Sequence, residues 1–307
     1  MGGLSSKDVL RADQFSVEEI DRILEAARRY EAALEAGEVL DELRGKLLAA
    51  LFFEPSTRTR LSFEAAMLRL GGRVVTVAEA KSSSAAKGES LHDTIKTVAG
   101  YADVIVLRHP RIGAAAEAAR ATDVPILNAG DGAGQHPTQA LLDLYTLVKE
   151  QGKVAGLTIA LVGDLKNGRT VHSLADLLAN YDVGFTFVAP EALRMPREIV
   201  ERLRSKGIEV RETASLGDAI PTCDVLYMTR IQRERFDDPA EYDRLKDAYV
   251  LRRDVLAAAR DSITIMHPLP RVNEISADVD DHPGAAYFRQ AANGVPVRMA
   301  LLAMVTR

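Results

Sequence analysis

Cysteine is almost absent from this sequence, because Cys223 is the only one among 307 residues. A single thiol excludes an intramolecular disulfide and any zinc or iron–sulfur site that needs several thiolates. Low cysteine use is also typical of a reducing compartment, so we expect a cytoplasmic protein. A chain of this length buries enough surface on folding to need neither a disulfide nor a structural metal.

Long apolar runs are missing as well. No stretch of 18 or more residues is both apolar and free of charge, so the sequence predicts no membrane-spanning helix. Residues 1–10 include Lys7 and Asp8 and have no apolar centre, so we expect no signal peptide there. The 39 Lys and Arg against 44 Asp and Glu give a net charge of −5, which argues against a nucleic-acid-binding protein.

Several common catalytic motifs do not occur. The six histidines show no H-E-x-x-H pattern, there is no G-x-x-x-x-G-K-[ST] loop, and the glycines of residues 163–168 lack the G-x-G-x-x-G spacing. The polar residues form no obvious pair of catalytic carboxylates and no Ser–His–Asp or Cys–His arrangement. The sequence therefore predicts no metal site and no bound cofactor.

The order of apolar runs and helical patterns predicts the fold. Ser16 and Glu19 form a capping box that starts a helix, and short apolar runs then alternate with helical patterns. Such alternation implies parallel sheets covered by helices on both faces. We therefore expect an α/β protein made of two doubly wound parallel-sheet domains joined by interdomain helices.

The positions of the expected elements follow from the same alternation. Strands are predicted at residues 47–53, 73–78, 103–108, 124–127, 157–162, 185–188, 208–210, 224–228 and 262–266. Further helices are predicted at residues 62–70, 91–99, 113–120, 137–150, 170–180, 197–206, 253–260 and 284–305. Residues 78–88 and 233–243 are predicted to be mobile loops.

Polar residues gather where predicted strands end, which is where ligands bind in such sheets. After the first strand, residues 56–60 are Ser-Thr-Arg-Thr-Arg and lead into a helix. The N–H groups at a helix N-terminus, together with hydroxyl and guanidinium donors, suit a phosphate group. The alternative is an ordinary capped helix with surface arginines.

Two other positions in the first half are candidates. Arg108 ends a strand, where it is either a binding residue or a solvated strand end. His136 and Gln139 lie near the start of the helix at residues 137–150. There His136 could donate to a carbonyl oxygen and Gln139 could accept from an amide, although a lone histidine is more often structural.

Strand ends in the second half carry further candidates. Arg169 starts a helix, where a carboxylate would be favoured, and Arg230 and Gln232 follow a strand two residues apart. Residues 267–271 are His-Pro-Leu-Pro-Arg, in which the prolines leave backbone carbonyls without local donors. Several arginines without a carboxylate pair predict a multiply anionic substrate pair, with catalysis by positioning and charge stabilisation.

Residues 56–60, His-Pro-Thr-Gln at 136–139 and His-Pro-Leu-Pro at 267–270 together resemble the aspartate/ornithine carbamoyltransferase family, in order along nearly the whole chain. Arg230 and Gln232 are similar to the aspartate branch; the ornithine branch has a Cys in the last motif, where this chain has Leu269. The resemblance implies transfer of the carbamoyl group of carbamoyl phosphate to the α-amine of L-aspartate. The products would be N-carbamoyl-L-aspartate and phosphate, in an early step of de novo pyrimidine biosynthesis.

The resemblance also implies a division of labour along the chain. Residues 1–135 would bind carbamoyl phosphate and residues 150–284 aspartate. Residues 136–149 would form a connecting helix, and a C-terminal helix at about 285–307 would pack back on the first domain.

Two sets of site residues follow from the same resemblance. The carbamoyl phosphate set is Ser56, Thr57, Arg58, Thr59, Arg108, His136, Gln139 and the backbone carbonyls of Leu269 and Pro270. The aspartate set is Lys87, Arg169, Arg230 and Gln232. The catalytic residues would be Arg58, Thr59, Arg108 and His136, of which the last three would act on the carbonyl oxygen.

Lys87 resembles a residue that the family contributes across a subunit interface, which implies a homotrimer with shared active sites. Whether a separate regulatory chain binds stays open, and so do three alternative functions. The chain could carbamoylate ornithine or another amine. It could be a two-domain solute-binding protein, which would need a secretion signal, or an inactive scaffold, although every polar position that the chemistry needs is filled.

Overall fold

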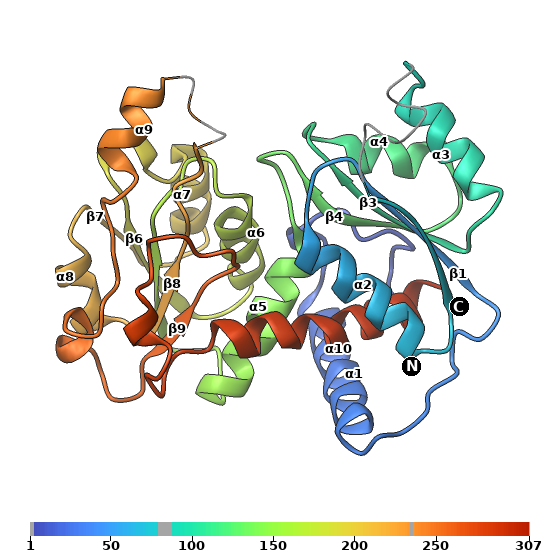
Figure 1. Cartoon of the computed structure of the whole chain (residues 1–307). Helices are drawn as coiled ribbons and strands as arrows, with labels where there is room; N and C mark the ends of the chain where they lie inside the picture. The colour runs from blue at the N-terminus through green and yellow to red at the C-terminus, as the bar shows by residue number, and fades with distance from the viewer. Residues whose placement is uncertain (1–2, 79–87, 234–235, 237, 307) are drawn as a thin grey trace. The chain divides into compact units, whose positions relative to one another are not determined.

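The computed structural model describes residues 3–78, 88–233, 236 and 238–306 (Figure 1). The chain divides into two compact units. The first unit consists of Met1–Leu142 together with Asn293–Arg307, and the second unit consists of Asp143–Ala292. The boundary therefore falls inside two helices, α5 (Pro137–Gln151) and α10 (Tyr287–Val305).

The first unit is built on a parallel sheet whose strand order, in the described residues, is β2-β1-β3-β4. Its strands are β1 (Leu47–Phe52), β2 (Arg73–Val77), β3 (Val104–His109) and β4 (Ile126–Asp131). Its helices, besides parts of α5 and α10, are η1 (Ala12–Gln14), α1 (Val17–Glu35), α2 (Thr57–Arg69), α3 (Leu91–Ala99) and α4 (Ala114–Ala121).

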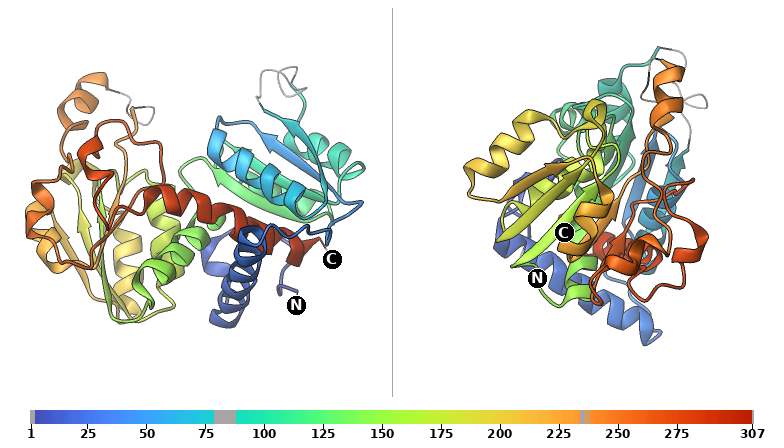
Figure 2. Two further views of the ribbon diagram at one scale, coloured as in Figure 1. Left: turned by 60° about the horizontal axis from the view of Figure 1, so that its bottom comes forward. Right: turned by 90° about the vertical axis from the view of Figure 1, so that its left-hand side faces the viewer.

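Both faces of this sheet are covered, as the continuous apolar runs of its central strands require. Ala49 and Leu51 of β1 pack against Ile95 of α3 and Ala118 of α4 on one face. Figures 1 and 2 show α2 on the opposite face. The strand order reverses between β1 and β3, so the carboxyl ends of these two strands form the expected ligand-binding edge.

The second unit contains a parallel sheet with the order β7-β6-β5-β8-β9 among the residues described. Its strands are β5 (Leu157–Val162), β6 (Val183–Val188), β7 (Val210–Thr213), β8 (Val225–Met228) and β9 (Thr264–Met266). Its helices are α6 (Arg169–Leu178), η4 (Glu191–Leu193), α7 (Arg197–Ser205), α8 (Leu216–Ala219), η5 (Ile220–Thr222), α9 (Pro239–Leu245), η7 (Val255–Ala258) and η8 (Ala277–Val279). In this sheet the order reverses between β5 and β8.

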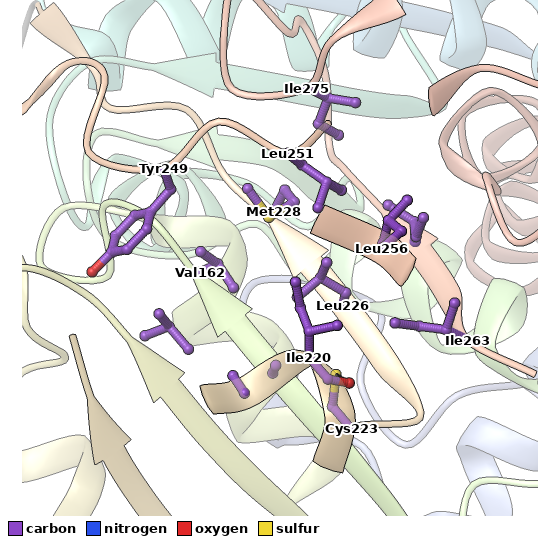
Figure 3. Close-up of a cluster of buried hydrophobic side chains, with 14 of the residues drawn as sticks. Val162, Ile220, Cys223, Leu226, Met228, Tyr249, Leu251, Leu256, Ile263 and Ile275 are labelled. Atoms are coloured by element: carbon purple, nitrogen blue, oxygen red, sulfur yellow. Dashed lines mark hydrogen bonds between the residues drawn. The ribbon is translucent and has the colours of Figure 1, made fainter. Parts of the chain in front are cut away.

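A cluster of buried apolar side chains covers one face of the second sheet (Figure 3). Val162, Leu226 and Met228 come from β5 and β8, while Ile220 and Cys223 come from the segment just before β8. Burial raises the pKa of the Cys223 thiol to about 12. The single thiol is therefore a packing residue and not a nucleophile.

The α/β class with two parallel sheets is confirmed, and so is the capping box, because the Ser16 hydroxyl accepts from Glu19 N and Glu19 Oε2 accepts from Ser16 N. Five predictions were wrong. The helix predicted at 253–260 is only the 3₁₀ turn η7. Two strands begin later than predicted: the one at 208–210 lies at Val210–Thr213, and the one at 124–127 lies at Ile126–Asp131.

The other two errors concern helix starts. The helix predicted at 62–70 begins at Thr57, because Ser56 takes the N-cap position. Residues 233–243, predicted to be a mobile loop, include the start of α9, where Asp238 caps the helix and Pro239 occupies its first turn. Most of the other predicted loop, residues 79–87, lies outside the described residues.

Candidate functional site

The start of α2 has the features of an anion site. Ser56 has an extended backbone (φ −162°, ψ 98°), and its side chain makes no capping hydrogen bond. The first turn contains no Asp or Glu; Thr59 is 7% exposed, while Thr57 and Arg58 are exposed. Because the first N–H groups of a helix lack intrahelical acceptors, this turn can hold a phosphate with backbone and side-chain donors together.

Arg108 lies beside this turn, at the end of β3. Its backbone pairs with Phe52 of β1, and the residue is only 8% exposed. Nη1 donates to the carbonyl oxygen of Ala129 at 3.1 Å, and Nη2 lies 3.4 Å from Oε2 of Glu54. The guanidinium is therefore held at the point where the strand order reverses, as a fixed positive charge.

The loop between β4 and α5 is held by Asp131. One carboxylate oxygen accepts from Gly113 N at 2.8 Å, and the other accepts from Gln135 N at 2.7 Å. The side-chain amide of Asn128 donates to Asp131 at 3.3 Å. Gly132 has φ +55°, and a Cβ there would lie 2.5 Å from Pro110 O, so no other residue fits this turn.

His136 and Gln139 follow this loop, at the start of α5, and both are buried, with 3% and 8% exposure. Gln139 N donates to His136 O at 3.0 Å. No role was predicted for Asn128 or Asp131, although both are polar residues in a segment with three glycines, which is a signal of a constrained loop. The first unit thus places the α2 start, Arg108 and the His136 loop after adjacent strands.

The second unit has a comparable arrangement at its own reversal point. Asp164 follows β5, is fully buried, and accepts from Asn167 N at 3.0 Å and from the backbone N–H of Gln232. Burial raises the pKa of this carboxyl group. Asp164 thereby ties the loop that precedes Arg169 to the segment that contains Arg230 and Gln232.

Gly163 brings these two loops together. Its φ is +118°, and a Cβ there would lie 2.4 Å from Thr229 O. Thr229 N and Oγ1 both donate to Val162 O, at 2.8 and 2.9 Å. The close backbone approach therefore requires glycine and fixes the carboxyl ends of β5 and β8 relative to each other.

The segment after β9 has an unusual backbone. Leu269 has φ 56°, and the Leu269–Pro270 peptide bond is cis. His267 is 1% exposed; its Nδ1 accepts from Leu269 N at 2.7 Å, and its Nε2 lies 2.7 Å from Glu274 Oε1. Burial alone would raise the pKa of Glu274, but the hydrogen bond from His267 and those from backbone N–H groups lower it below its usual value.

The predicted residues are thus divided between the units. Ser56, Thr57, Arg58, Thr59, Arg108, His136 and Gln139 lie in the first unit, and Arg169, Arg230, Gln232, Leu269 and Pro270 lie in the second. Lys87 lies outside the described residues.

Two features are absent from the described residues. Across residues 3–78 and 88–306, less the few that are not described, no three His, Cys, Asp or Glu side chains are grouped to hold a metal ion. No helix in the described part of the chain is both long and apolar enough to cross a membrane.

Comparison with known protein families identifies both halves of the chain. Residues 7–149 match the carbamoyl-P binding domain of aspartate/ornithine carbamoyltransferases, and residues 155–305 match the Asp/Orn binding domain. The aspartate carbamoyltransferase catalytic subunit of Thermococcus kodakarensis is 57% identical over 298 residues, which cover 97% of this chain and 96% of the relative.

Solved structures agree with this result. The catalytic subunit of Methanocaldococcus jannaschii aspartate transcarbamoylase has a TM-score of 0.91 at 53% identity and covers 98% of each chain. The aspartate transcarbamoylase of Trypanosoma cruzi in complex with carbamoyl phosphate has a TM-score of 0.93 at 44% identity, covering 99% of this chain and 96% of that one. The same enzyme is also known with carbamoyl phosphate and aspartate bound. The resemblance found in the sequence is confirmed.

Proposed function

The chain belongs to the aspartate/ornithine carbamoyltransferase family, and on that premise we propose that it is an aspartate carbamoyltransferase catalytic chain. It transfers the carbamoyl group of carbamoyl phosphate to the α-amine of L-aspartate, which serves pyrimidine biosynthesis. The observation that carries the proposal is the identity of 57% over 97% of the chain to a catalytic subunit of that name. Leu269, in place of the ornithine branch's cysteine, supports aspartate as the acceptor.

The first unit would bind carbamoyl phosphate. The start of α2, with Ser56 to Thr59, would hold the phosphate through N–H, hydroxyl and guanidinium donors. Arg108 would bridge the phosphate and the carbonyl oxygen, since its guanidinium is already oriented by Ala129 and Glu54. Such prior orientation matters because donors that need not reorganise stabilise a transition state most effectively.

The reaction then needs no covalent intermediate on the protein. The neutral α-amine of aspartate attacks the carbamoyl carbon, a C–N bond forms, and the bond from that carbon to the phosphate oxygen breaks. Thr59, Arg108 and His136 would stabilise the oxyanion that develops on the carbonyl oxygen. The leaving phosphate takes up the proton that the amine loses, so atoms and charges balance without a protein base.

The remaining groups would hold the amide and the amino acid. Gln139 and the carbonyl oxygens of Leu269 and Pro270 would accept from the carbamoyl NH2. The carboxylates of aspartate would bind Arg169, Arg230, Gln232 and Lys87. For Arg230 and Gln232 the support is that Asp164 and Gly163 fix the loops that contain them.

A homotrimer is part of the proposal, and an exposed apolar surface on the first unit supports association. Leu61 and Leu68, seven residues apart on α2, are 51% and 59% exposed. Val75 of β2, a strand at the edge of the sheet, is 48% exposed. Large apolar side chains exposed on two neighbouring elements of one unit are consistent with an interface with another protein chain. A separate regulatory chain is a further possible partner. The cytoplasm is the proposed location, because a protein with a single reduced thiol is expected in a reducing compartment.

One assay tests the activity. The purified chain is given carbamoyl phosphate with L-aspartate or with L-ornithine, and the carbamoylated amino acid is measured. We expect turnover with aspartate only. Arg108→Ala should lower kcat by about 100- to 1,000-fold, because it removes an oriented oxyanion donor. Arg120→Ala, on the exposed side of α4, is the matched control and should leave kcat unchanged. Turnover with ornithine alone would reject the aspartate assignment.

Subunit mixing tests the shared site. Lys87→Ala and Arg58→Ala chains, each nearly inactive alone, should regain activity when mixed, because a hybrid trimer would contain some sites with neither change. Light scattering verifies that the mixed chains have assembled. Assembly without recovered activity would show that Lys87 does not act across an interface.

A further inference from the structure

The segment that follows β9 is connected to a buried polar network whose role the reaction scheme leaves unexplained. Its members are His267, Glu274, Gln290, Asp143 and Tyr227, which are at most 4% exposed. They come from the segment after β9, from α10, from α5 and from β8. Burying five polar side chains costs more than apolar packing of the same volume, so the network invites a functional explanation.

We propose that His267 and Glu274 are positioning residues, which hold Leu269 and Pro270 in the backbone conformation in which their carbonyls accept from the carbamoyl NH2. The inference rests on the proposed function and extends it from the groups that contact substrate to the groups that orient them. Neither side chain is assigned a contact with substrate.

The first support is the backbone of Leu269. A φ of 56° is unfavourable for a residue with a branched side chain, so the surroundings must impose it. His267 Nδ1 does so locally by accepting from Leu269 N at 2.7 Å. This hydrogen bond links the network directly to the unusual backbone.

The second support is the protonation state of His267. Because Nδ1 accepts an N–H, it holds no proton, and the proton of the neutral ring must be on Nε2. Nε2 then donates to Glu274 Oε1 at 2.7 Å. The other Glu274 oxygen accepts from Val272 N and Asn273 N at 3.0 and 3.1 Å, so Glu274 fixes the tautomer and the course of the chain.

The third support is the anchoring of His267 to the interior. His267 N donates to Gln290 Oε1 at 2.8 Å, and Gln290 Nε2 donates to Asp143 Oδ1 at 2.7 Å. Asp143 Oδ2 accepts from the Tyr227 hydroxyl at 2.7 Å. This series anchors the backbone of residue 267, and the hydrogen bonds at Nδ1 and Nε2 then fix its imidazole ring.

The chemistry of the segment indicates what it binds. Pro268 and Pro270 have no N–H, so Leu269 has the only backbone donor of residues 268–270, and His267 occupies it. What the backbone of this segment offers is therefore carbonyl oxygens alone. Pro270 is exposed and Leu269 half-buried, so a ligand with N–H donors can reach them.

A pair of substitutions separates the two hydrogen bonds of His267. An Asn side chain places its amide near Nδ1 and can still accept from Leu269 N, whereas a Gln side chain reaches Glu274 but leaves Leu269 N without an acceptor. We expect His267→Gln to weaken carbamoyl phosphate binding by about tenfold and to lower kcat. His267→Asn, which loses only the bond to Glu274, should weaken carbamoyl phosphate binding clearly less than His267→Gln does.

Inhibition by inorganic phosphate separates a positioning role from general structural damage, because such damage would weaken phosphate binding as well. Phosphate is proposed to bind the start of α2 in the first unit, so its inhibition constant should be the same in all variants. His282→Gln is the matched control, because His282 Nδ1 accepts from Gly284 N at 3.0 Å in the same i to i+2 geometry. It should leave both affinities unchanged.

Glu274→Gln supplies a second test if His267→Gln does not fold. A Gln side chain can accept from His267 or from the two backbone N–H groups, but not from both, so we expect the same selective loss of carbamoyl phosphate affinity. If the wild type is active and the folded variants bind carbamoyl phosphate as tightly as it does, the inference is overturned but the proposed function stands. A wild type without carbamoyl transfer would overturn the proposed function and the inference together.

Discussion

Removing the Asp131 carboxylate should destabilise the first unit by an amount that can be worked out from its hydrogen bonds. The side chain is 6% exposed, and each of its two oxygens accepts from a different backbone N–H, those of Gly113 and Gln135. Asp131→Ala leaves both partly buried donors without a protein acceptor. At about 1–3 kcal/mol for each, the expected loss is about 2–6 kcal/mol.

Asp131→Asn gives an intermediate case. The amide oxygen can serve one N–H, but the NH2 group faces the other donor, so we expect about half the loss, roughly 1–3 kcal/mol. Asp123→Ala is the control, because Asp123 is fully exposed and lies 4.0 Å from Lys7, which makes a surface pair. Its effect should stay within about 0.5 kcal/mol.

Thermal unfolding followed by far-ultraviolet circular dichroism measures the difference. For a domain of this size, 1 kcal/mol corresponds to about 2–4 °C, so Asp131→Ala should lower the midpoint by roughly 4–24 °C. The midpoints should fall in the order wild type, Asp131→Asn, Asp131→Ala, and this order is as informative as the size of the differences. A midpoint for Asp131→Ala no lower than that of Asp123→Ala would refute the role of this carboxylate in holding the loop before His136.

Three further predictions follow from single positions. Gly163→Ala should abolish most activity and destabilise the second unit, because its Cβ would meet Thr229 O at 2.4 Å; Gly207→Ala, which has φ +80° and open space, is the control and should cost only about 1 kcal/mol. Native Cys223, buried and with its pKa raised to about 12, should react with iodoacetamide only on unfolding, and rapid labelling of the native chain would contradict its placement. The pKa of Glu274 is lowered on folding, so the ionised carboxylate stabilises the folded protein above its usual pKa of 4.5, and this stabilisation is lost as the pH falls below that value. The difference in unfolding midpoint between the wild type and Glu274→Gln should therefore shrink below pH 4.5.

Elements with strong local signals could be predicted from the sequence. Leu157–Val162 is a strand and Leu91–Ala99 a helix at the predicted residues, since the first is a continuous apolar run and the second has a regular apolar face. The start of α2 could not be placed in this way. Its first turn is rich in Thr and Arg with little apolar periodicity, so only the capping position of Ser56 marks where it begins.

The candidate site was predictable to a similar degree. Arg108 and His136 could be singled out because each occupies a strand or helix end in a recognisable motif. The groups that anchor His267 in the interior could not. Tyr227 and Asp143 are 84 residues apart in the chain, and Gln290 is 147 residues from Asp143. Pairing over such separations depends on the fold as a whole, which no local pattern specifies.

The discontinuity of the first unit bears on how the protein is made. Its final segment, Asn293–Arg307, contributes Met299 to Val305, all buried, and is translated after every residue of the second unit. A nascent chain therefore exposes an incomplete N-terminal core while the ribosome is still producing the other half, which can fold on emergence. Chaperone demand should be highest during that interval, and termination before codon 293 would release a chain whose N-terminal core lacks its last helix turns.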